Sequence, residues 1–209
     1  MLSLQQGVVV YESDRPFRFL PSRQSKRELA LCDITVQRGE VVGVFGPSGC
    51  GKSTLAKVLA GIQPLHRGTL SVPVRPQGQA NPVQWVAQQP EFAFNPYLTL
   101  EQSLRESWRE TDFSAMLADF HIHPAWLARR PSQLSGGQLQ RLNVVRALIP
   151  STQFLLCDEI SAPLDLLTQQ QLWQTLLRHC KARHIGVLVI SHDRALLNQV
   201  CDRQVRCEP

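Results

Sequence analysis

Short apolar runs, each bounded by polar or glycine-rich segments, recur along this chain of 209 residues. The clearest are Val41–Phe45, residues 154–157 and Gly186–Ile190, and continuous apolar runs of this length are typical of strands buried on both faces of a parallel sheet. Helix-like stretches separate them and would carry the chain back along the sheet. The pattern predicts an α/β fold with a mostly parallel core sheet.

The remaining elements follow from weaker patterns. Apolar residues at helical spacing predict helices over residues 53–60, 138–149 and 169–183, and shorter β segments are expected at 7–11, 32–36, 69–72 and Val83–Val86. The short strands near the N-terminus would pair antiparallel and form an N-terminal β subdomain. The charged, proline-containing stretch 12–28 is expected to be a loop, and its densest basic run, 22–28, an exposed part of it.

A different periodicity marks the middle of the chain. Leu104, Trp108, Met116, Leu117, Phe120 and Trp126 have the spacing of amphipathic helices. They predict a small helical lobe, at about 91–138, inserted into one domain whose core is formed by residues 1–90 and 139–209. Both tryptophans are expected to be packing residues.

The stretch GPSGCGKS fits the phosphate-binding pattern GxxxxGK[ST] and lies between a predicted strand and a predicted helix. Glycines allow the backbone N–H groups to surround an anion, and the helix N-terminus adds a favourable dipole. Lys52 would reach the β and γ phosphates, and the hydroxyl of Ser53 would ligate Mg²⁺. The expected nucleotide-binding set here is Gly46, Ser48, Gly49, Gly51, Lys52, Ser53 and Thr54.

Polar residues follow two of the predicted core strands, where ligands bind in sheets of this kind. Asp158 and Glu159 follow the run 154–157. Asp158 would hold Mg²⁺ and Glu159 would polarise the water that attacks the γ phosphate. His192 follows the strand Gly186–Ile190 and is a candidate γ-phosphate sensor.

Composition narrows the functional classes. The net charge is +5, but the 22 lysines and arginines form no long cluster, so no nucleic-acid partner is expected. The six cysteines contain no CxxC pair, which fits free thiols better than a zinc ribbon or a redox dithiol. No apolar run approaches membrane-spanning length, and the N-terminus lacks the pattern of an export signal, so a cytosolic protein is expected.

With LSGGQ at residues 134–138 added to these motifs, the sequence resembles the ATP-binding subunits of ABC transporters. The ordered set is GPSGCGKST, the glutamine of VAQQPEF, LSGGQLQR, LLCDE and SHD, and it covers nearly the whole chain. The resemblance implies a P-loop NTPase of ABC ATPase type that binds ATP and Mg²⁺. It also implies a head-to-tail dimer in which LSGGQ closes over the ATP held by the partner.

The resemblance assigns further residues. In the dimer, Ser135, Gly136, Gly137 and Gln138 would contact the partner's ATP. Gln88 would sense Mg²⁺ and the γ phosphate and so join the catalytic set of Lys52, Glu159 and His192, with Gln89 as the competing candidate. Tyr11 matches the aromatic residue that stacks on adenine, with Phe17 and Phe19 as alternatives and simple strand packing as another reading. Metal ligation would fall to Ser53, Gln88 and Asp158.

Finer features point to a subfamily and to partners. QQPEFAFNPYLTL resembles the corresponding stretch of peptide and nickel importer ATPases. The implied partners are integral-membrane permease subunits and a second ATPase subunit, with an external substrate-binding protein acting indirectly, at the cytoplasmic face of the inner membrane. Ala162 and Pro163 depart from the Ser-Ala that the family shows before Leu-Asp, so a paralogous partner is expected rather than an identical one. The alternative is a soluble ABC-type ATPase of a non-transport complex, in translation, DNA repair or enzyme assembly.

Overall fold

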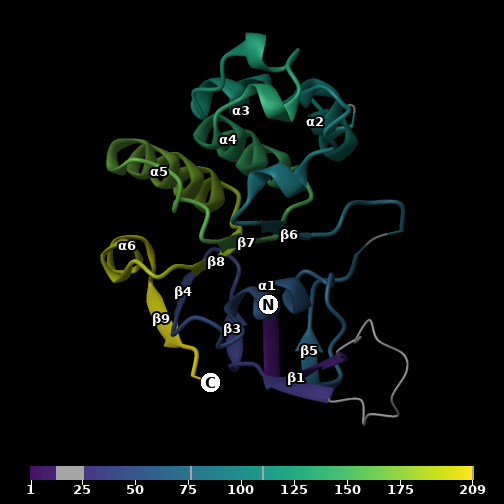
Figure 1. Cartoon of the computed structure of the whole chain (residues 1–209), viewed down its shortest axis with the longest axis vertical. Helices are drawn as coiled ribbons and strands as arrows, with labels where there is room; N and C mark the ends of the chain where they lie inside the picture. The colour runs from purple at the N-terminus through teal and green to yellow at the C-terminus, as the bar shows by residue number, and fades with distance from the viewer. Residues whose placement is uncertain (13–25, 76, 110, 209) are drawn as a thin grey trace, which may run out of the picture.

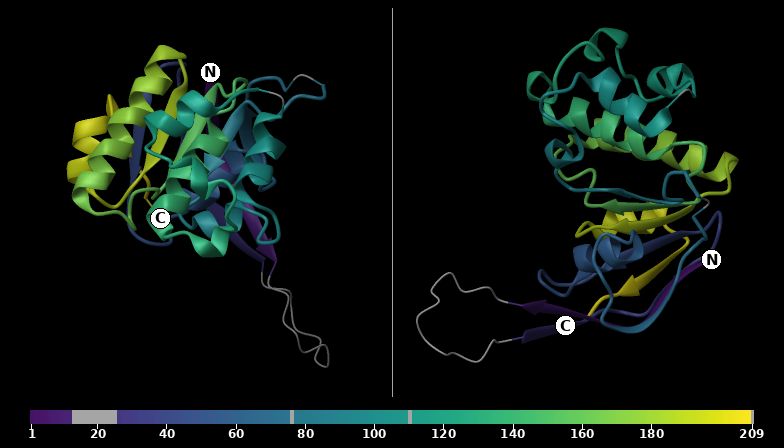
Figure 2. Two further views of the ribbon diagram at one scale, coloured as in Figure 1. Left: turned by 90° about the horizontal axis from the view of Figure 1, so that it is seen from above. Right: turned by 90° about the vertical axis from the view of Figure 1, so that its right-hand side faces the viewer.

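The computed structural model describes residues 1–12, 26–75, 77–109 and 111–208. An antiparallel sheet, a parallel sheet and a helical lobe follow one another along the long axis of the molecule (Figures 1 and 2). The prediction of an α/β fold with an N-terminal antiparallel subdomain and an inserted helical lobe is confirmed.

The parallel sheet has the strand order β6-β7-β8-β4-β9. Every residue of β7 and β8 is buried, because helices or other strands cover both faces of the sheet. Four of these five strands were predicted, with bounds that match the structure or differ by one residue. The strands are β4 (Val41–Phe45), β6 (Val83–Val86), β7 (Phe154–Asp158), β8 (Gly186–Ile190) and β9 (Arg203–Arg206).

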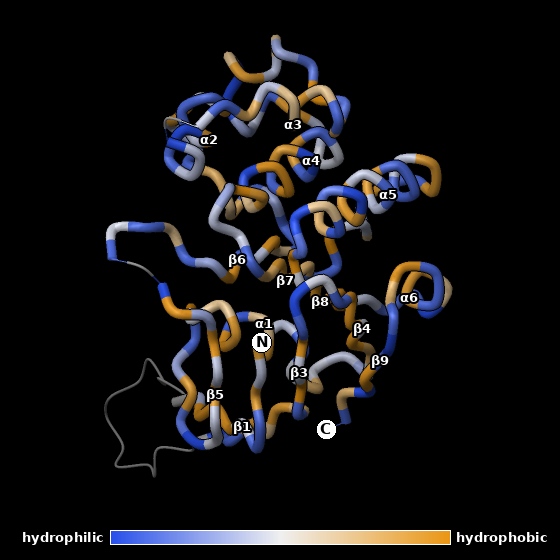
Figure 3. Tube along the Cα trace, turned by 180° about the vertical axis from the view of Figure 1, so that it is seen from behind, coloured by the Kyte–Doolittle hydropathy of each residue, from blue (hydrophilic) through white to orange (hydrophobic). Residues whose placement is uncertain are grey.

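Alternate residues of the central strands enter two separate hydrophobic cores. Leu155 and Cys157 join the core that contains the helical lobe, whereas Phe154 and Leu156 join the core shared with the antiparallel sheet. In Figure 3 the strands of this sheet are mostly hydrophobic, and hydrophilic residues predominate on the outer sides of the helices. The sheet therefore holds both layers in place and fixes the loops at its strand ends.

The antiparallel sheet is organised by β1 (Leu2–Glu12), which pairs with β2 (Lys26–Ala30), β3 (Ile34–Val36) and β5 (Arg67–Ser71). The prediction of an exposed loop through residue 28 is wrong for its last residues. Residues 26–28 belong to β2 because they pair with residues 10–12 of β1, a cross-strand contact that local charge does not reveal. Residues 22–25 lie outside the described part of the chain.

The helical lobe contains α2 (Leu100–Trp108), α3 (Ser114–Asp119) and the short 3-10 turns η1 (Pro90–Ala93), η2 (Pro124–Trp126) and η3 (Pro131–Gln133). Thr99 caps α2 by accepting from the Gln102 N–H, and the Gln102 side chain accepts from the Thr99 N–H. Trp108 is 5% exposed and its Nε1–H donates to the carbonyl of Val145 at 3.0 Å. This tryptophan packs as expected and fastens the lobe to α4 (Gly136–Ala147).

Three further helices flank the parallel sheet. The predicted α1 (Lys52–Leu59) and α5 (Leu166–Ala182) are present, with α5 beginning three residues earlier than expected because Asp165 caps it. The sequence reasoning did not identify α6 (Arg194–Val200) or the edge strand β9. Among the described residues, no helix is both long and apolar enough to cross a membrane.

Candidate functional site

The phosphate-binding loop connects β4 to α1 and needs glycine for two different reasons. At Gly46 a Cβ would lie 2.2 Å from the carbonyl oxygen of Cys207, so only glycine fits against that backbone. Gly51 has a φ of 96°, in the left-handed region, and immediately precedes α1. The loop can therefore turn sharply and direct backbone N–H groups toward a bound anion.

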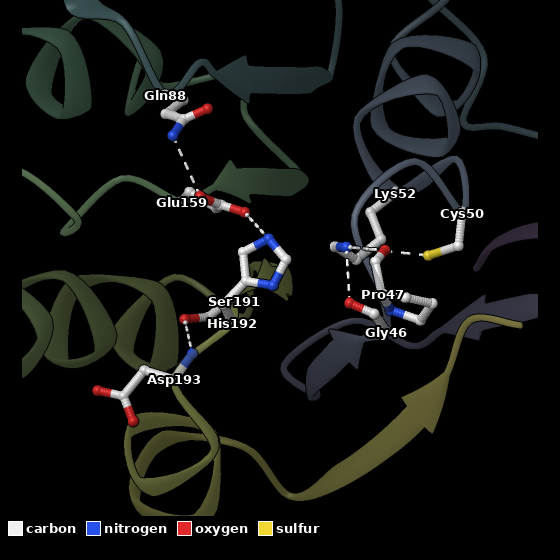
Figure 4. A network of polar contacts seen from close by, with 9 residues as sticks. All are labelled: Gly46, Pro47, Cys50, Lys52, Gln88, Glu159, Ser191, His192 and Asp193. Carbon is white, nitrogen blue, oxygen red and sulfur yellow. Dashed lines mark hydrogen bonds and ion pairs between the residues drawn. The ribbon is translucent and has the colours of Figure 1, made fainter.

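Lys52, the first residue of α1, is 6% exposed. Its Nζ donates to the carbonyls of Gly46 and Pro47, both at 2.9 Å, and contacts the sulfur of Cys50 at 3.8 Å (Figure 4). These partners hold the ammonium group within its own loop. Its positive charge thus lies where the loop amides would bind phosphate.

A cavity of about 420 Å³ opens beside this loop and is lined by Gly49, Gly51, Lys52, Ser53 and Thr54 together with Tyr11. The Tyr11 hydroxyl lies 2.8 Å from Oγ1 of Thr54, and the tyrosine is 41% exposed. The structure thus places Tyr11 next to the phosphate-binding loop, as a base-stacking residue requires. Phe17 and Phe19 lie outside the described residues.

The same cavity has two lining residues that sequence reasoning missed, Arg27 and Leu29. Both belong to β2, and they reach the cavity because β2 pairs with β1, whose Val10 lies opposite Glu28. No local motif marks them. Their place at the cavity depends on the pairing of β2 with β1, which a local pattern does not indicate.

The two carboxylates at the end of β7 have different environments. Asp158 is the last residue of the strand, and Glu159 follows it with a φ of 49°, which is strained for a residue other than glycine. The Glu159 N–H donates to the carbonyl of Ile190 at 3.0 Å. This bond links the end of β7 to the end of β8, next to His192.

Glu159 is the centre of a three-residue cluster (Figure 4). Its Oε1 lies 2.8 Å from Nε2 of His192, and its Oε2 accepts from Nε2 of Gln88 at 3.1 Å. The Glu159 side chain is only 19% exposed, whereas that of His192 is 49% exposed. A carboxylate with one hydrogen-bonding residue on each oxygen is oriented to act on a water molecule.

The sequence around His192 fixes the position of the imidazole. The Asp193 N–H donates to the hydroxyl of Ser191 at 3.0 Å, and the Asp193 carboxylate accepts from the N–H groups of Ala195 and Leu196 at the start of α6. These bonds cap α6 and set the turn between β8 and α6. His192 lies within this turn and faces Glu159.

Asp158 is 4% exposed, and burial is the main reason that its pKa is raised. A hydrogen bond from the Ser53 side chain opposes this effect by lowering the pKa. A hydroxyl and a carboxylate in contact are hard oxygen donors of the kind that Mg²⁺ prefers. The described residues contain no cluster of three or more His, Cys, Asp or Glu side chains that could hold a metal ion.

Asp158→Asn should stabilise the protein at neutral pH. The pKa of Asp158 is higher in the folded protein than its ordinary value of 3.8, so folding loses stability as the pH rises above 3.8, and the full loss is reached above the folded pKa. Asparagine removes the buried charge and keeps an acceptor for Ser53. We expect the melting temperature at pH 7 to rise by about 2–4 °C, which corresponds to roughly 1 kcal/mol for a domain of this size. The difference should vanish below about pH 3, where Asp158 is protonated in both the folded and the unfolded state; an equal difference at both pH values would contradict this origin.

A second cavity, of about 490 Å³, is lined in part by Ser53 and Asp158. Gln88 and Gln89 both line it. Within the described part of the chain, Gln88 is the one of the two that forms a hydrogen bond with Glu159. Sequence reasoning missed the other polar and aromatic residues of this lining. They are Lys57, Trp85, Phe92 and Arg146.

The LSGGQ segment begins α4 through a capping box. The Gln138 N–H donates to Oγ of Ser135 at 3.3 Å, and the Ser135 N–H donates to Oε1 of Gln138 at 3.1 Å. A Cβ at Gly136 would meet nothing within 4 Å, whereas one at Gly137 would meet Leu164. None of these four residues lines either cavity described above. The segment therefore presents an open helix N-terminus away from the chain's own phosphate-binding loop.

The sequence profile described as "ABC transporter" matches residues 29–162. The chain belongs to the ABC transporter family. A relative among reviewed proteins is the nickel import system ATP-binding protein NikE of Staphylococcus aureus strain N315, which is 36% identical over 192 residues that cover 86% of this chain and 80% of the relative. As an ATP-binding cassette of this family, the protein is an ATPase.

Solved structures agree on the fold. The dimeric, post-hydrolysis structure of the ATP-binding cassette MJ0796 with ADP and Pi has a TM-score of 0.79 at 20% identity and covers 100% of this chain and 94% of its own. A cobalt transport ATP-binding protein, cbiO-2, has a TM-score of 0.69 at 21% identity over 95% of this chain and 72% of its own. Both solved structures match this chain over nearly its whole length, so the likeness includes both sheets and the helical lobe.

Proposed function

We propose that this protein is the ATP-hydrolysing subunit of an importer of the peptide or nickel type. The observation that carries the proposal is the Gln88–Glu159–His192 cluster, at the edge of the sheet that also positions the phosphate-binding loop. The nickel import relative supports the transport class, and the stretch 88–100 supports the same subfamily. Which cargo is carried would depend on the permease and on any external binding protein.

In this proposal each residue has one task. The loop amides from Gly46 to Thr54 bind the phosphates, and Lys52 exchanges its contacts with the loop carbonyls for contacts with the β and γ phosphates. Glu159 takes a proton from the attacking water, and His192 and Gln88 orient its carboxylate. Mg²⁺, held through Ser53, Asp158 and Gln88, would neutralise charge that develops on the phosphate oxygens.

The second half of each site would come from another subunit. Ser135, Gly136, Gly137 and Gln138 form the N-terminus of α4. The Ser135 and Gln138 N–H groups are used in the capping box, so the N–H groups of Gly136 and Gly137 would bind the γ phosphate of a partner's ATP. In this proposal these residues contact nucleotide held by a second subunit, which agrees with their absence from the linings of the two cavities beside the phosphate-binding loop. ATP would then hold two subunits head to tail, and hydrolysis would release them.

The second cavity would link this motion to a permease. It contains Gln88, so its shape depends on the contact between Gln88 and Glu159. Large aromatic side chains stand exposed at its edge or close to it in sequence, with Phe92 83% and Tyr97 81% exposed. Exposed aromatic residues beside a cavity are typical of protein interaction sites. We infer that a membrane permease docks here, which would place the protein at the cytoplasmic face of the inner membrane.

We infer that the second ATPase subunit is a paralogue. Ala162 and Pro163 are exposed in the segment between Glu159 and α5, where the family usually has a serine. Leu166 and Leu167 follow, 82% and 65% exposed. In the proposed dimer, the exposed apolar residues Ala162, Pro163, Leu166 and Leu167 would face the other subunit. They lack the serine hydroxyl that a symmetric contact would use. A complementary partner surface therefore suits it better than a second copy.

The dimer test uses purified Glu159→Gln protein with ATP and Mg²⁺, which should trap any closed dimer. We expect the protein alone to remain a monomer in light scattering coupled to size-exclusion chromatography. Adding a paralogous ATPase subunit should give a dimer that depends on ATP, and Lys52→Ala protein is the matched control that should give none. A homodimer with two bound nucleotides and no other chain would overturn the paralogue proposal but keep the head-to-tail one.

A further inference from the structure

A buried tryptophan of α5 is hydrogen bonded to the segment that follows Glu159. Trp173 is 3% exposed and lies in the first half of the helix. Its Nε1–H donates to Oγ of Ser161 at 3.1 Å. Ser161 lies two residues after Glu159 and is itself only 6% exposed. The ATPase chemistry described above uses neither Trp173 nor Ser161.

The backbone of Glu159 has a conformation that needs support from its surroundings. Its φ of 49° lies in the left-handed region, which residues with a Cβ keep only where the rest of the structure holds them. Its N–H donates to the carbonyl of Ile190, and its carbonyl accepts from the N–H of Ala162 at 3.2 Å. The first bond ties Glu159 to β8. The second ties it only to its own turn, so the turn must be held by something else.

The bond between Trp173 and Ser161 supplies that support. Ala162 and Pro163 are exposed, so the outer part of the turn has little packing to hold it. Ile160 is buried in the same hydrophobic core as Trp173, but apolar packing has no preferred direction. A hydrogen bond does have one, and it fixes the turn between Glu159 and Ala162 relative to α5.

The same tryptophan lies near the turn that carries His192. A cavity of about 460 Å³ is lined by Trp173 together with Asp193, Ala195 and Leu196 from the start of α6. Asp193 directly follows His192 and caps α6. One side chain of α5 is therefore close to both turns whose residues form the contact between Glu159 and His192.

We propose that Trp173 is a positioning residue for ATP hydrolysis. Through Ser161 it holds the turn that keeps the Glu159 carboxylate in contact with His192 and Gln88, and so directed at the attacking water. The proposal rests on the proposed function, because it takes Glu159 as the general base. Trp173 itself touches neither nucleotide nor water in this account.

Trp173→Phe should lower kcat and leave KM for ATP unchanged. Phenylalanine keeps most of the apolar contacts but has no N–H group, so Ser161 loses its donor and the turn is less firmly held. Because a small misplacement of a reacting group can cost up to about 100-fold in rate, we expect kcat to fall by about tenfold. The residues that bind the phosphates are unchanged, so ATP affinity should stay the same. The rate is measured with the partner subunits present.

Trp108→Phe is the matched control. It also removes one buried indole hydrogen bond, from Nε1 to the carbonyl of Val145 at 3.0 Å, and Trp108 is 5% exposed. Both tryptophan variants should lower the melting temperature by similar amounts, since each loses one bond of the same kind. Trp108→Phe should nevertheless keep kcat within about twofold of the unaltered protein. An equal fall of kcat in both variants would show a merely structural role and overturn the proposal.

A double-mutant cycle tests whether the bond itself is the cause. Ser161→Ala removes the acceptor and should lower kcat as Trp173→Phe does. The double variant should fall no further than either single variant, because all three lose the same interaction. Ser161→Thr keeps the hydroxyl group and should retain most of the activity. Effects of the two single changes that multiply in the double variant would contradict the proposal.

Hydrogen exchange measured residue by residue by NMR examines the isolated chain without its partners. In Trp173→Phe the amide of Glu159 should exchange about tenfold faster, whereas in Trp108→Phe it should exchange at the unaltered rate. An unchanged exchange rate at Glu159 in Trp173→Phe, or an unchanged kcat, would overturn the proposal. Glu159→Gln is included in the same rate assay. If that variant hydrolysed ATP at the unaltered rate, the assignment of Glu159 as the base would fail instead.

Discussion

Lys52→Ala should reduce the affinity for ATP by about 100-fold or more, because charge-assisted hydrogen bonds to phosphate contribute about 1.5–3 kcal/mol each. Lys52 is buried and its ammonium group is already held at the loop by the carbonyls of Gly46 and Pro47. Alanine removes the charge at the point where the phosphates would lie. Isothermal titration with ATP and Mg²⁺ measures the change directly.

The matched control is Lys181→Ala, which removes an exposed lysine from the last turn of α5 and should leave the affinity unchanged. Thermal unfolding of both variants is needed, since Lys52→Ala also removes a donor from two loop carbonyls. A folded Lys52→Ala protein that binds ATP as tightly as the unaltered protein would show that nucleotide does not occupy this loop.

Glu159→Gln should preserve ATP binding and reduce the steady-state hydrolysis rate by about 10²–10⁴-fold, the usual contribution of a general base. Glutamine has nearly the same shape, and its amide can still pair with Gln88 or His192, but it cannot take a proton from water. The rate is to be measured with the partner subunits present, because the account requires a second subunit to complete each site.

Glu101→Gln is the control for this change. Glu101 is exposed in the first turn of α2 and is far in sequence from the phosphate-binding loop and from Glu159. It should hydrolyse ATP at the unaltered rate. If Glu159→Gln retained steady hydrolysis within a few-fold of the unaltered protein, Glu159 would not be the base, and the role of its contacts with His192 and Gln88 would have to be structural.

The sequence predicted the central sheet well because its strands are buried on both faces. A strand such as β8 must be apolar at every position, so its pattern does not depend on what its neighbours are. The position of Lys52 and Ser53 was equally predictable, since the phosphate-binding pattern lies within eight consecutive residues, 46–53. The same holds for the segment that begins at Ser135, where the capping box lies within four residues.

Contacts between distant segments could not be predicted in the same way. β2 is a strand because it pairs with β1, although its own residues are largely charged. The link between Glu159 and Ile190, which brings the carboxylate to His192, depends on the order of strands in the sheet. The contact of Cys207 with the phosphate-binding loop depends on β9, which the sequence pattern did not reveal.

The central claim is that ATP-driven closure of this subunit acts on a membrane permease, and affinity capture tests it most directly. Glu159→Gln protein is incubated with ATP and Mg²⁺, captured from mildly solubilised native membranes, and its partners are identified. The double variant Phe92→Ser with Tyr97→Ser is the control, because it keeps the nucleotide site and alters the proposed docking surface. We expect a polytopic membrane protein together with a second ATPase, and the control should lose the membrane protein but keep the ATPase. Recovery of only soluble complexes or ribosomes would contradict it and would show that the ATPase drives a process other than transport.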